Sequence, residues 1–209
     1  MSFEIEKRFK NFNYKNIKQL LKINNIKKEG SYLYKIIMFH SLKEGQIIRI
    51  RDEGTKITFT IKQKNPNNYS TEYEVIVNDY MMIEQMLYQL NITKNYDLHK
   101  IREIYRTSDN NSEIIFDHYP GLPPYIEIES KTENELNKLM KVLGLKDEKS
   151  FHAGDLYTNL YNITKDRKNE SLTFNNATQI FTPYILKNKE KFLKRINIQI
   201  KFLQKKKLI

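Results

Sequence analysis

The feature that most constrains the fold is a series of short segments in which charged and apolar residues alternate. In the first of them, residues 3–9, Glu4, Glu6 and Arg8 occupy alternate positions, and the apolar residues Phe3, Ile5 and Phe9 fall on the other set. Successive side chains of a β-strand point to opposite faces, so such a segment gathers its charged groups on one face. Ionisable residues at a spacing of two recur in further segments, at 46–51, 56–64, 70–77, 97–107 and 125–129. The sequence therefore predicts a sheet with one charged and one apolar face.

Turn signals between these segments predict how the strands are connected. Asp52-Glu53-Gly54 and the loop 108–111 are typical of hairpins, which join antiparallel strands. With 31–39 and 113–118 we count eight strands. Helical patterns at 14–25, 80–90, 132–143 and 147–161 separate or follow them. We predict an α+β fold in which the eight strands close into an antiparallel barrel, because closure removes exposed edges.

The charged faces have two possible environments. They are solvated if the strands form a sandwich, since charged residues are mostly exposed. If the amphipathic helices cover the apolar faces instead, the charged faces turn inward. An enclosed interior must then pair its charges or bind a ligand. Clustered carboxylates suit Mg²⁺ or Mn²⁺, and arginines and lysines suit phosphate oxygens. An enclosed, charged interior is therefore suited to bind a metal-bound polyphosphate.

The net charge of +11 is concentrated in the last part of the chain. Residues 165–209 contain 12 Lys or Arg against 3 Asp or Glu. We therefore divide the chain into a main domain, 1–164, and a basic extension, 165–209, with a linker and an amphipathic helix over 182–203. This helix either contacts RNA, an acidic surface or another protein, or packs back on the barrel.

Composition excludes several other classes of protein. The chain has no cysteine, which excludes disulfide frameworks and thiolate metal sites. It has no apolar run of about 18 residues, so we expect no membrane span, and we expect a cytoplasmic location. His40, His99, His118 and His152 follow no metal-ligand spacing, and we interpret them as structural or surface residues.

Two motifs resemble a known family. Glu4-Ile5-Glu6-Lys7-Arg8 resembles the N-terminal Glu-x-Glu-x-Lys signature of the CYTH domain, the family of triphosphate tunnel metalloenzymes. The segment 117–129 resembles that family's late hairpin, an aspartate followed by a loop and a second Glu-x-Glu, here Glu127 and Glu129. The resemblance covers residues 2–162. Its relatives include class IV adenylate cyclases, thiamine triphosphatases and inorganic triphosphatases.

The resemblance implies a fold and a site. The fold is an eight-stranded closed antiparallel tunnel with flanking helices. The resemblance implies that a divalent metal is held by Glu4, Glu6, Glu127 and Glu129. It implies that Asp117, with Glu74 in preference to Glu72, holds a second metal or orients water. The groups implied to bind phosphate are Arg8, Arg49, Arg51, Lys62, Lys100 and Arg102.

The function implied is metal-dependent hydrolysis of a triphosphate, either inorganic, nucleoside or another organic triphosphate. Three alternatives stay open: a class IV adenylate cyclase, an RNA 5′-triphosphatase, and a module that binds polyphosphate without turnover. One residue departs from the family pattern, because Arg8 stands where the signature has lysine. Arginine keeps the positive charge but does not donate its proton. Activity therefore survives if the role of this position is electrostatic.

Overall fold

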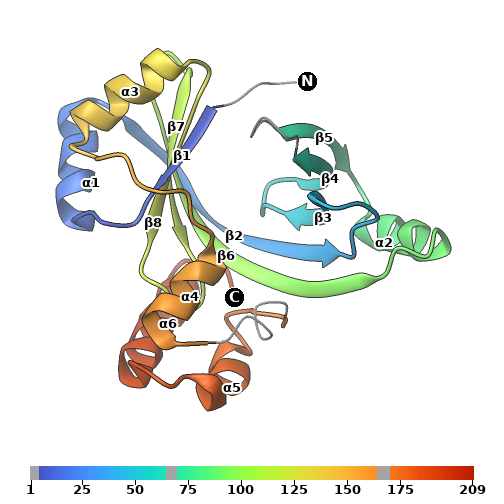
Figure 1. Ribbon diagram of the computed structural model, residues 1–209. Coiled ribbons are helices and arrows are strands. Elements are labelled where there is room, and N and C mark those ends of the chain that lie inside the picture. Colours follow the sequence, from blue (N-terminus) through green and yellow to red (C-terminus); the bar gives the residue numbers. More distant parts are fainter. Residues whose placement is uncertain (1–4, 65–69, 164–169) are drawn as a thin grey trace.

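The computed structural model describes residues 5–64, 70–163 and 170–209, and one curved antiparallel sheet runs through it (Figure 1). The sheet has eight strands in the order β1-β8-β7-β6-β2-β3-β4-β5. Their bounds are β1 Ile5–Phe9, β2 Lys27–Phe39, β3 Gln46–Asp52, β4 Ile57–Lys64, β5 Ser70–Val77, β6 Lys94–Arg106, β7 Ser112–His118 and β8 Tyr125–Ser130. The number of strands and their antiparallel arrangement agree with the sequence prediction.

The predicted closure of the barrel is wrong, because the sheet is open between β1 and β5 in the described part of the chain. The long ladder of β2 and β6 explains why. β7 pairs with 101–106 of β6, whereas β3 pairs with 35–39 of β2, at the opposite end of that ladder. The first wing (β1, β8, β7) and the second wing (β3, β4, β5) therefore diverge, as their ribbons show in Figure 1.

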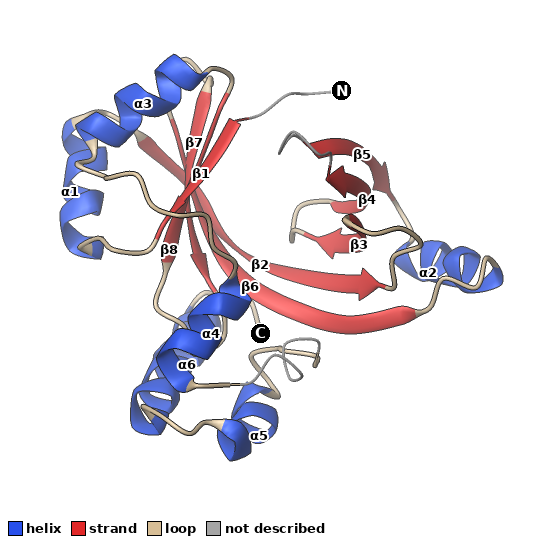
Figure 2. Cartoon of the chain, viewed as in Figure 1, coloured by secondary structure: helices blue, strands red, loops and turns tan. Residues whose placement is uncertain are grey.

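Helices cover the outer side of the first wing (Figure 2). These are α1, Tyr14–Ile23, and α3, Glu133–Val142. Thr132 caps α3 as predicted, since its hydroxyl accepts from the backbone N–H of Glu135 at 3.3 Å. On β8, Ile126 and Ile128 are 0% exposed in the core under these helices, whereas Glu127 between them points to the inner face. The helices thus turn the charged face inward.

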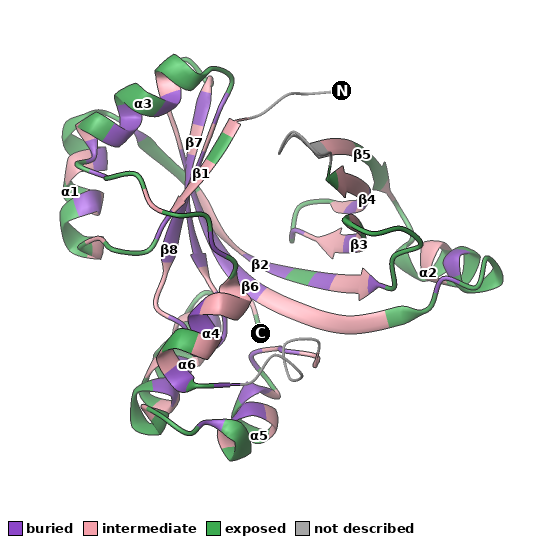
Figure 3. Cartoon of the chain, in the orientation of Figure 1, coloured by how far each residue is buried: buried purple, intermediate pink, exposed green. Residues whose placement is uncertain are grey.

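The other helices of the described residues lie beside the second wing and below the sheet (Figure 1). They are α2 Tyr80–Gln89, α4 Ala153–Tyr161, α5 Ala177–Phe181, the 3-10 turn η2 Thr182–Tyr184, and α6 Lys189–Lys205. Figure 3 shows buried residues along β7 and β8 and where α4, α5 and α6 meet. Among the described residues, no helix has the length and apolar character needed to cross a bilayer.

Several predicted boundaries differ from the structure. The break expected at 28–30 is a bulge within β2. The helix expected from residue 147 begins at Ala153, where the Asp155 carboxylate accepts from the N–H of His152 at 2.8 Å. The helix expected from residue 182 begins at Lys189, because Asn188 takes a left-handed conformation with φ 57°.

The apolar face of α6 packs against the rest of the molecule. Phe192 and Ile196 are 0% exposed in a core that they share with Tyr119 and Leu122 of the β7–β8 loop. The lysines Lys205, Lys206 and Lys207 are exposed. The apolar face of α6 therefore contributes to the core, which agrees with one of the two alternatives predicted for this helix.

Candidate active site

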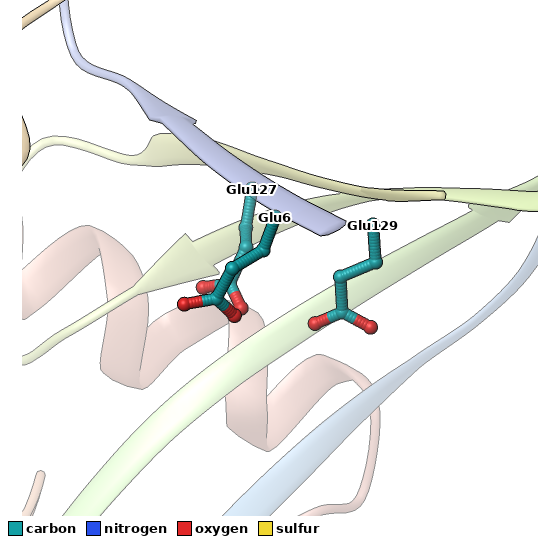
Figure 4. Close-up of side chains that lie close together, drawn as sticks. All are labelled: Glu6, Glu127 and Glu129. Atoms are coloured by element: carbon teal, nitrogen blue, oxygen red, sulfur yellow. The ribbon is translucent and has the colours of Figure 1, made fainter. Parts of the chain in front are cut away.

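Three glutamates from two neighbouring strands form the acidic part of the site. In the β1–β8 ladder, Glu6 lies opposite Glu129 and Arg8 lies opposite Glu127. One carboxylate oxygen from each of Glu6, Glu127 and Glu129 lies within 4.8 Å of the others. Figure 4 shows the three side chains extending to the same side of their strands. Because hard divalent cations prefer oxygen ligands, this donor set fits Mg²⁺ or Mn²⁺.

Arg8 partly balances these negative charges. Its Nε lies 3.1 Å from Oε2 of Glu127, and its Nη2 lies 3.1 Å from Oε1 of Glu6. Burial acts to raise the pKa of Glu127, but the charges of Arg102 and Arg8 outweigh it and hold that pKa well below its usual range. Burial and the charge of Glu127 raise the pKa of Glu6. The cluster is therefore short of positive charge at Glu6, which is a condition that a bound cation relieves.

A buried aspartate supports two cations beside this cluster. Asp117 is 0% exposed and accepts from Lys100 Nζ at 2.8 Å. It also accepts from Arg102 Nε at 2.9 Å and Nη2 at 2.8 Å, a two-point pair. Burial, followed by the charge of Arg102, lowers the pKa of Lys100 to about 8. Asp117 thus fixes both cations at the inner face.

The second wing supplies further cations, each paired with a glutamate. Arg49 Nη2 and Lys62 Nζ both lie 3.2 Å from the carboxylate of Glu72. Arg51 Nη2 lies 3.1 Å from Oε2 of Glu74. Burial, followed by the charge of Arg51, lowers the pKa of Arg49. The positive charges of this wing therefore repel one another, and an anion between them would relieve the repulsion.

Two guanidinium nitrogens have unused hydrogen-bonding capacity. Among the described residues, Nε of Arg49 and Nε of Arg51 are buried without a hydrogen-bond partner. A buried donor without a partner carries the cost of its lost hydration. Phosphate oxygens accept from arginine forks, so a bound phosphate would offer partners here.

The two wings face one cavity of about 460 Å³. Its wall contains the three glutamates Glu6, Glu127 and Glu129. Its wall also contains every cation predicted to bind phosphate: Arg8, Arg49, Arg51, Lys62, Lys100 and Arg102. The structure thus brings together most of the residues that the sequence selected.

Two predicted residues lie off the described cavity wall, and the position of a third is not described. Glu4 falls outside the described residues. Asp117 lies beneath Lys100 and Arg102 and is absent from the described cavity wall, as is Glu74. Glu72, the residue that we ranked second, lines the cavity instead. Strand alternation gives the face on which a side chain lies, but it does not give its depth.

Sequence reasoning missed Tyr34 and Glu53. Tyr34 on β2 lies among three cations of the site, with its ring centroid 5.4 Å from Cζ of Arg102, 5.7 Å from Cζ of Arg51 and 5.8 Å from Nζ of Lys100. Its hydroxyl donates to Glu53 at 3.3 Å, and Glu53 lies 2.7 Å from Nη2 of Arg51. The alternation of 31–39 places Tyr34 on the inner face. Glu53 lies in the turn signal after a predicted strand, where alternation does not predict the direction of a side chain.

Two tyrosines, Tyr119 and Tyr125, form a further part of the cavity wall. Their rings stack on each other, with centroids 5.9 Å apart and planes at 16°. Both line the cavity and are nearly buried. Burial is the main cause that raises the pKa of each hydroxyl. The pair forms a rigid aromatic wall at the end of the first wing.

The fold is a curled antiparallel sheet, and its inner face gathers carboxylates and cations around one cavity. Together, this fold and this cavity define the class of protein. The chain belongs to the CYTH domain family, whose model matches residues 34–153. The predicted resemblance is thereby confirmed. No curated protein matches the sequence.

Solved structures are similar in fold. The PH1012 protein from Pyrococcus horikoshii is 23% identical with a TM-score of 0.60, over 69% of this chain and 92% of that one. A putative adenylate cyclase from Vibrio parahaemolyticus is 15% identical with a TM-score of 0.60, over 75% and 98%. A putative adenylyl cyclase from Hippeastrum with a dominant triphosphatase activity is 17% identical with a TM-score of 0.51, over 76% and 95%.

Proposed function

We propose that this chain is a divalent-metal-dependent hydrolase of triphosphate substrates. The observation that carries the proposal is that the carboxylates Glu6, Glu127 and Glu129 share one cavity with six arginines and lysines. Membership in the CYTH family and the triphosphatase activity of the similar Hippeastrum protein support it. The proposal places metal ligands and phosphate-binding groups on facing strands of the same sheet.

Glu6, Glu127 and Glu129 would hold the metal, with Glu4 as a further proposed ligand. Bound Mg²⁺ or Mn²⁺ supplies positive charge and Lewis acidity at phosphate oxygens. Arg8, which contacts both Glu6 and Glu127, would offset the repulsion between their carboxylates and present its remaining N–H groups to the cavity. Cations from both wings bind and orient the phosphates, and they stabilise the charge that develops on the phosphoryl oxygens in the transition state.

We propose a positioning role for Asp117. Its carboxylate accepts three hydrogen bonds from Lys100 and Arg102, and it is 0% exposed. These hydrogen bonds occupy all but one of the roughly four lone-pair sites of the carboxylate, which disfavours a second metal there. Through its two-point pair it fixes the guanidinium of Arg102, whose Nη2 lies 3.8 Å from Oε2 of Glu127. We propose the corresponding role for Glu74, which pairs with Arg51.

The substrate panel that tests this function uses the full chain with Mg²⁺ or Mn²⁺. Tripolyphosphate, nucleoside triphosphates and a 5′-triphosphorylated RNA are supplied in turn. Free phosphate and cyclic nucleotides are both measured. Release of phosphate that requires the metal supports a triphosphatase. No turnover of any triphosphate with either metal contradicts it.

The cyclase alternative is supported by the fold it shares with the putative adenylate cyclase from Vibrio parahaemolyticus. A cyclase would direct the ribose hydroxyl, rather than water, to the phosphate. Cyclic AMP as the main product from ATP would therefore replace the hydrolase proposal. The non-catalytic alternative predicts that Glu129→Gln keeps or raises the affinity for tripolyphosphate, because the variant removes a negative charge.

The exposed lysines of α6 are our candidate contact for RNA or another acidic surface. Lys191, Lys194, Lys201 and Lys205 are exposed along this helix. Since α6 also contributes to the core, charge-reversal variants test this contact better than a deletion. The division of the chain at residue 164 and the cytoplasmic location stay predictions.

A further inference from the structure

An uncharged region of the cavity lies beside the candidate phosphate-binding cations. On the inner face of the central ladder, Ile36 of β2 lies opposite Leu98 of β6, and Met38 lies opposite Tyr96. All four side chains line the cavity, and all but Ile36 are partly exposed. We call these four residues the apolar block. Partly exposed apolar side chains inside a charged cavity gain stability only if something covers them.

The apolar block borders the cations on two sides. Along β6, Tyr96 and Leu98 are followed on the same face by Lys100. Across β2, Ile36 lies opposite Arg51, and Met38 lies opposite Arg49. Neighbouring strands are about 4.8 Å apart, so a group resting on the block is within one strand spacing of both arginines.

A segment beyond the matched family region closes this end of the cavity. Leu172 forms a parallel bridge with Leu98. The bridge is held by Leu172 N–H donating to Asp97 O at 2.7 Å and by His99 N–H donating to Leu172 O at 2.9 Å. Leu172 and Phe181 then line the cavity together with Tyr157 of α4. The C-terminal extension thus builds an apolar wall next to the block.

We propose that the cavity selects organic triphosphates, with an uncharged, flat or apolar group resting on the apolar block and against the C-terminal wall. The inference rests on the triphosphate site proposed above and names its substrate class. A cavity of about 460 Å³ has the size of pockets that take drug-sized ligands. Phosphates at Arg49, Arg51 and Lys100 leave the organic group over Leu98 and Met38. Inorganic triphosphate has no group that would cover these side chains.

The test compares ATP with tripolyphosphate in wild-type protein and in Leu98→Ala and Leu172→Ala variants. We expect kcat/KM to be higher for ATP in the wild type. We expect each variant to lower kcat/KM for ATP by about tenfold, the effect of losing apolar contact in a pocket. The value for tripolyphosphate should not change, because its phosphates do not touch the block.

Ile37→Ala is the matched control. Ile37 lies on the same strand as Ile36 and packs on the opposite side, in the core around Phe39 and Ile48. It controls for the loss of stability that any apolar truncation of this sheet causes. We expect Ile37→Ala to change the values for ATP and tripolyphosphate in parallel.

The outcomes separate this inference from the proposed function. Equal losses for both substrates in Leu98→Ala, or a wild-type preference for tripolyphosphate, overturn the inference and leave the triphosphatase intact. If neither substrate is hydrolysed, the proposed function fails, and calorimetric binding of the same two ligands decides the inference. Tighter binding of ATP that weakens only in Leu98→Ala and Leu172→Ala then supports it, and equal binding overturns it.

Discussion

At the scale of single residues, the site depends on which side chains bridge two charges. Arg8 contacts Glu127 through Nε and Glu6 through Nη2. A lysine has the same charge on a single nitrogen and cannot reproduce this fork. Arg8 therefore contributes both a positive charge and the fork geometry of its guanidinium. Substitutions can separate these two contributions.

We expect Arg8→Lys to keep kcat within about tenfold of the wild type, because the charge at the acidic cluster is preserved. We expect Arg8→Gln to lose about 100-fold or more, the usual effect of removing one donor that stabilises transition-state charge. Steady-state phosphate release measures both. If Arg8→Lys is as inactive as Arg8→Gln, the guanidinium itself is required.

Asp117→Asn leaves Lys100 and Arg102 buried without their counter-ion. We expect the variant to lose about 3–5 kcal/mol in the free energy of unfolding, as for other broken buried pairs. Tripolyphosphate should then raise the melting temperature more in the variant than in the wild type, because it restores negative charge. If the variant instead loses stabilisation by Mg²⁺ or Mn²⁺, Asp117 binds metal and the positioning role is wrong.

His99 gives a pH dependence of stability. Burial, and then the charge of Lys35, lower the pKa of His99 to about 4, below its ordinary value of 6.5. Between these values the unfolded chain binds more protons than the folded chain, so stability falls as pH falls from 6.5 to 4. Chemical denaturation of wild type and His99→Gln across this window should show a steeper fall in the wild type. Parallel profiles would mean that His99 does not contribute.

At the scale of elements, α6 holds the β7–β8 loop that carries Tyr119. The buried amide of Gln199 accepts from Gly121 N–H at 2.8 Å and donates to Tyr119 O at 2.9 Å and Leu122 O at 3.2 Å. Gly121 has φ +75°, and a Cβ there would lie 2.2 Å from the ring of Phe192. The helix and the loop are therefore fitted to each other.

Gln199→Leu removes all three hydrogen bonds and leaves buried backbone groups without partners. We expect a loss on the order of 3 kcal/mol in the free energy of unfolding, since each unsatisfied group costs about 1–3 kcal/mol. Gln204→Leu, at an exposed position of the same helix, is the control and should change stability little. Equal effects of the two variants would show that the loop is not held by Gln199.

The sequence predicted the elements best where side chains alternate strictly. Glu6 and Arg8, Lys100 and Arg102, and Glu127 and Glu129 were placed correctly on the inner face, because a period of two fixes the face of a strand. The alternation carries no information on the stagger between strands far apart in the chain. The open edge between β1 and β5 and the full burial of Asp117 therefore could not be predicted. The late starts of α4 and α6 depend on local contacts at His152 and Asn188.

At the scale of the whole molecule, two wings of one sheet bring opposite charges to a shared cavity. The first wing contributes the acidic cluster, the second contributes Arg49, Arg51 and Lys62, and the central ladder contributes Lys100 and Arg102. The helices on the outer side bury the apolar faces, which leaves the ionisable groups inside. The C-terminal extension completes the wall through Leu172 and Phe181, so the cavity extends beyond the matched family segment.

The most direct test of this account is the metal dependence of triphosphate hydrolysis in wild type and Glu129→Gln. Phosphate release is measured while Mn²⁺ is titrated into metal-free protein, with Glu44→Gln, a change in an exposed loop, as the control. We predict no turnover without metal, saturable activation in wild type and Glu44→Gln, and a loss of about 100-fold or more in Glu129→Gln. Activity that persists in metal-free protein, or that is equal in all three proteins, would contradict the proposed metal site.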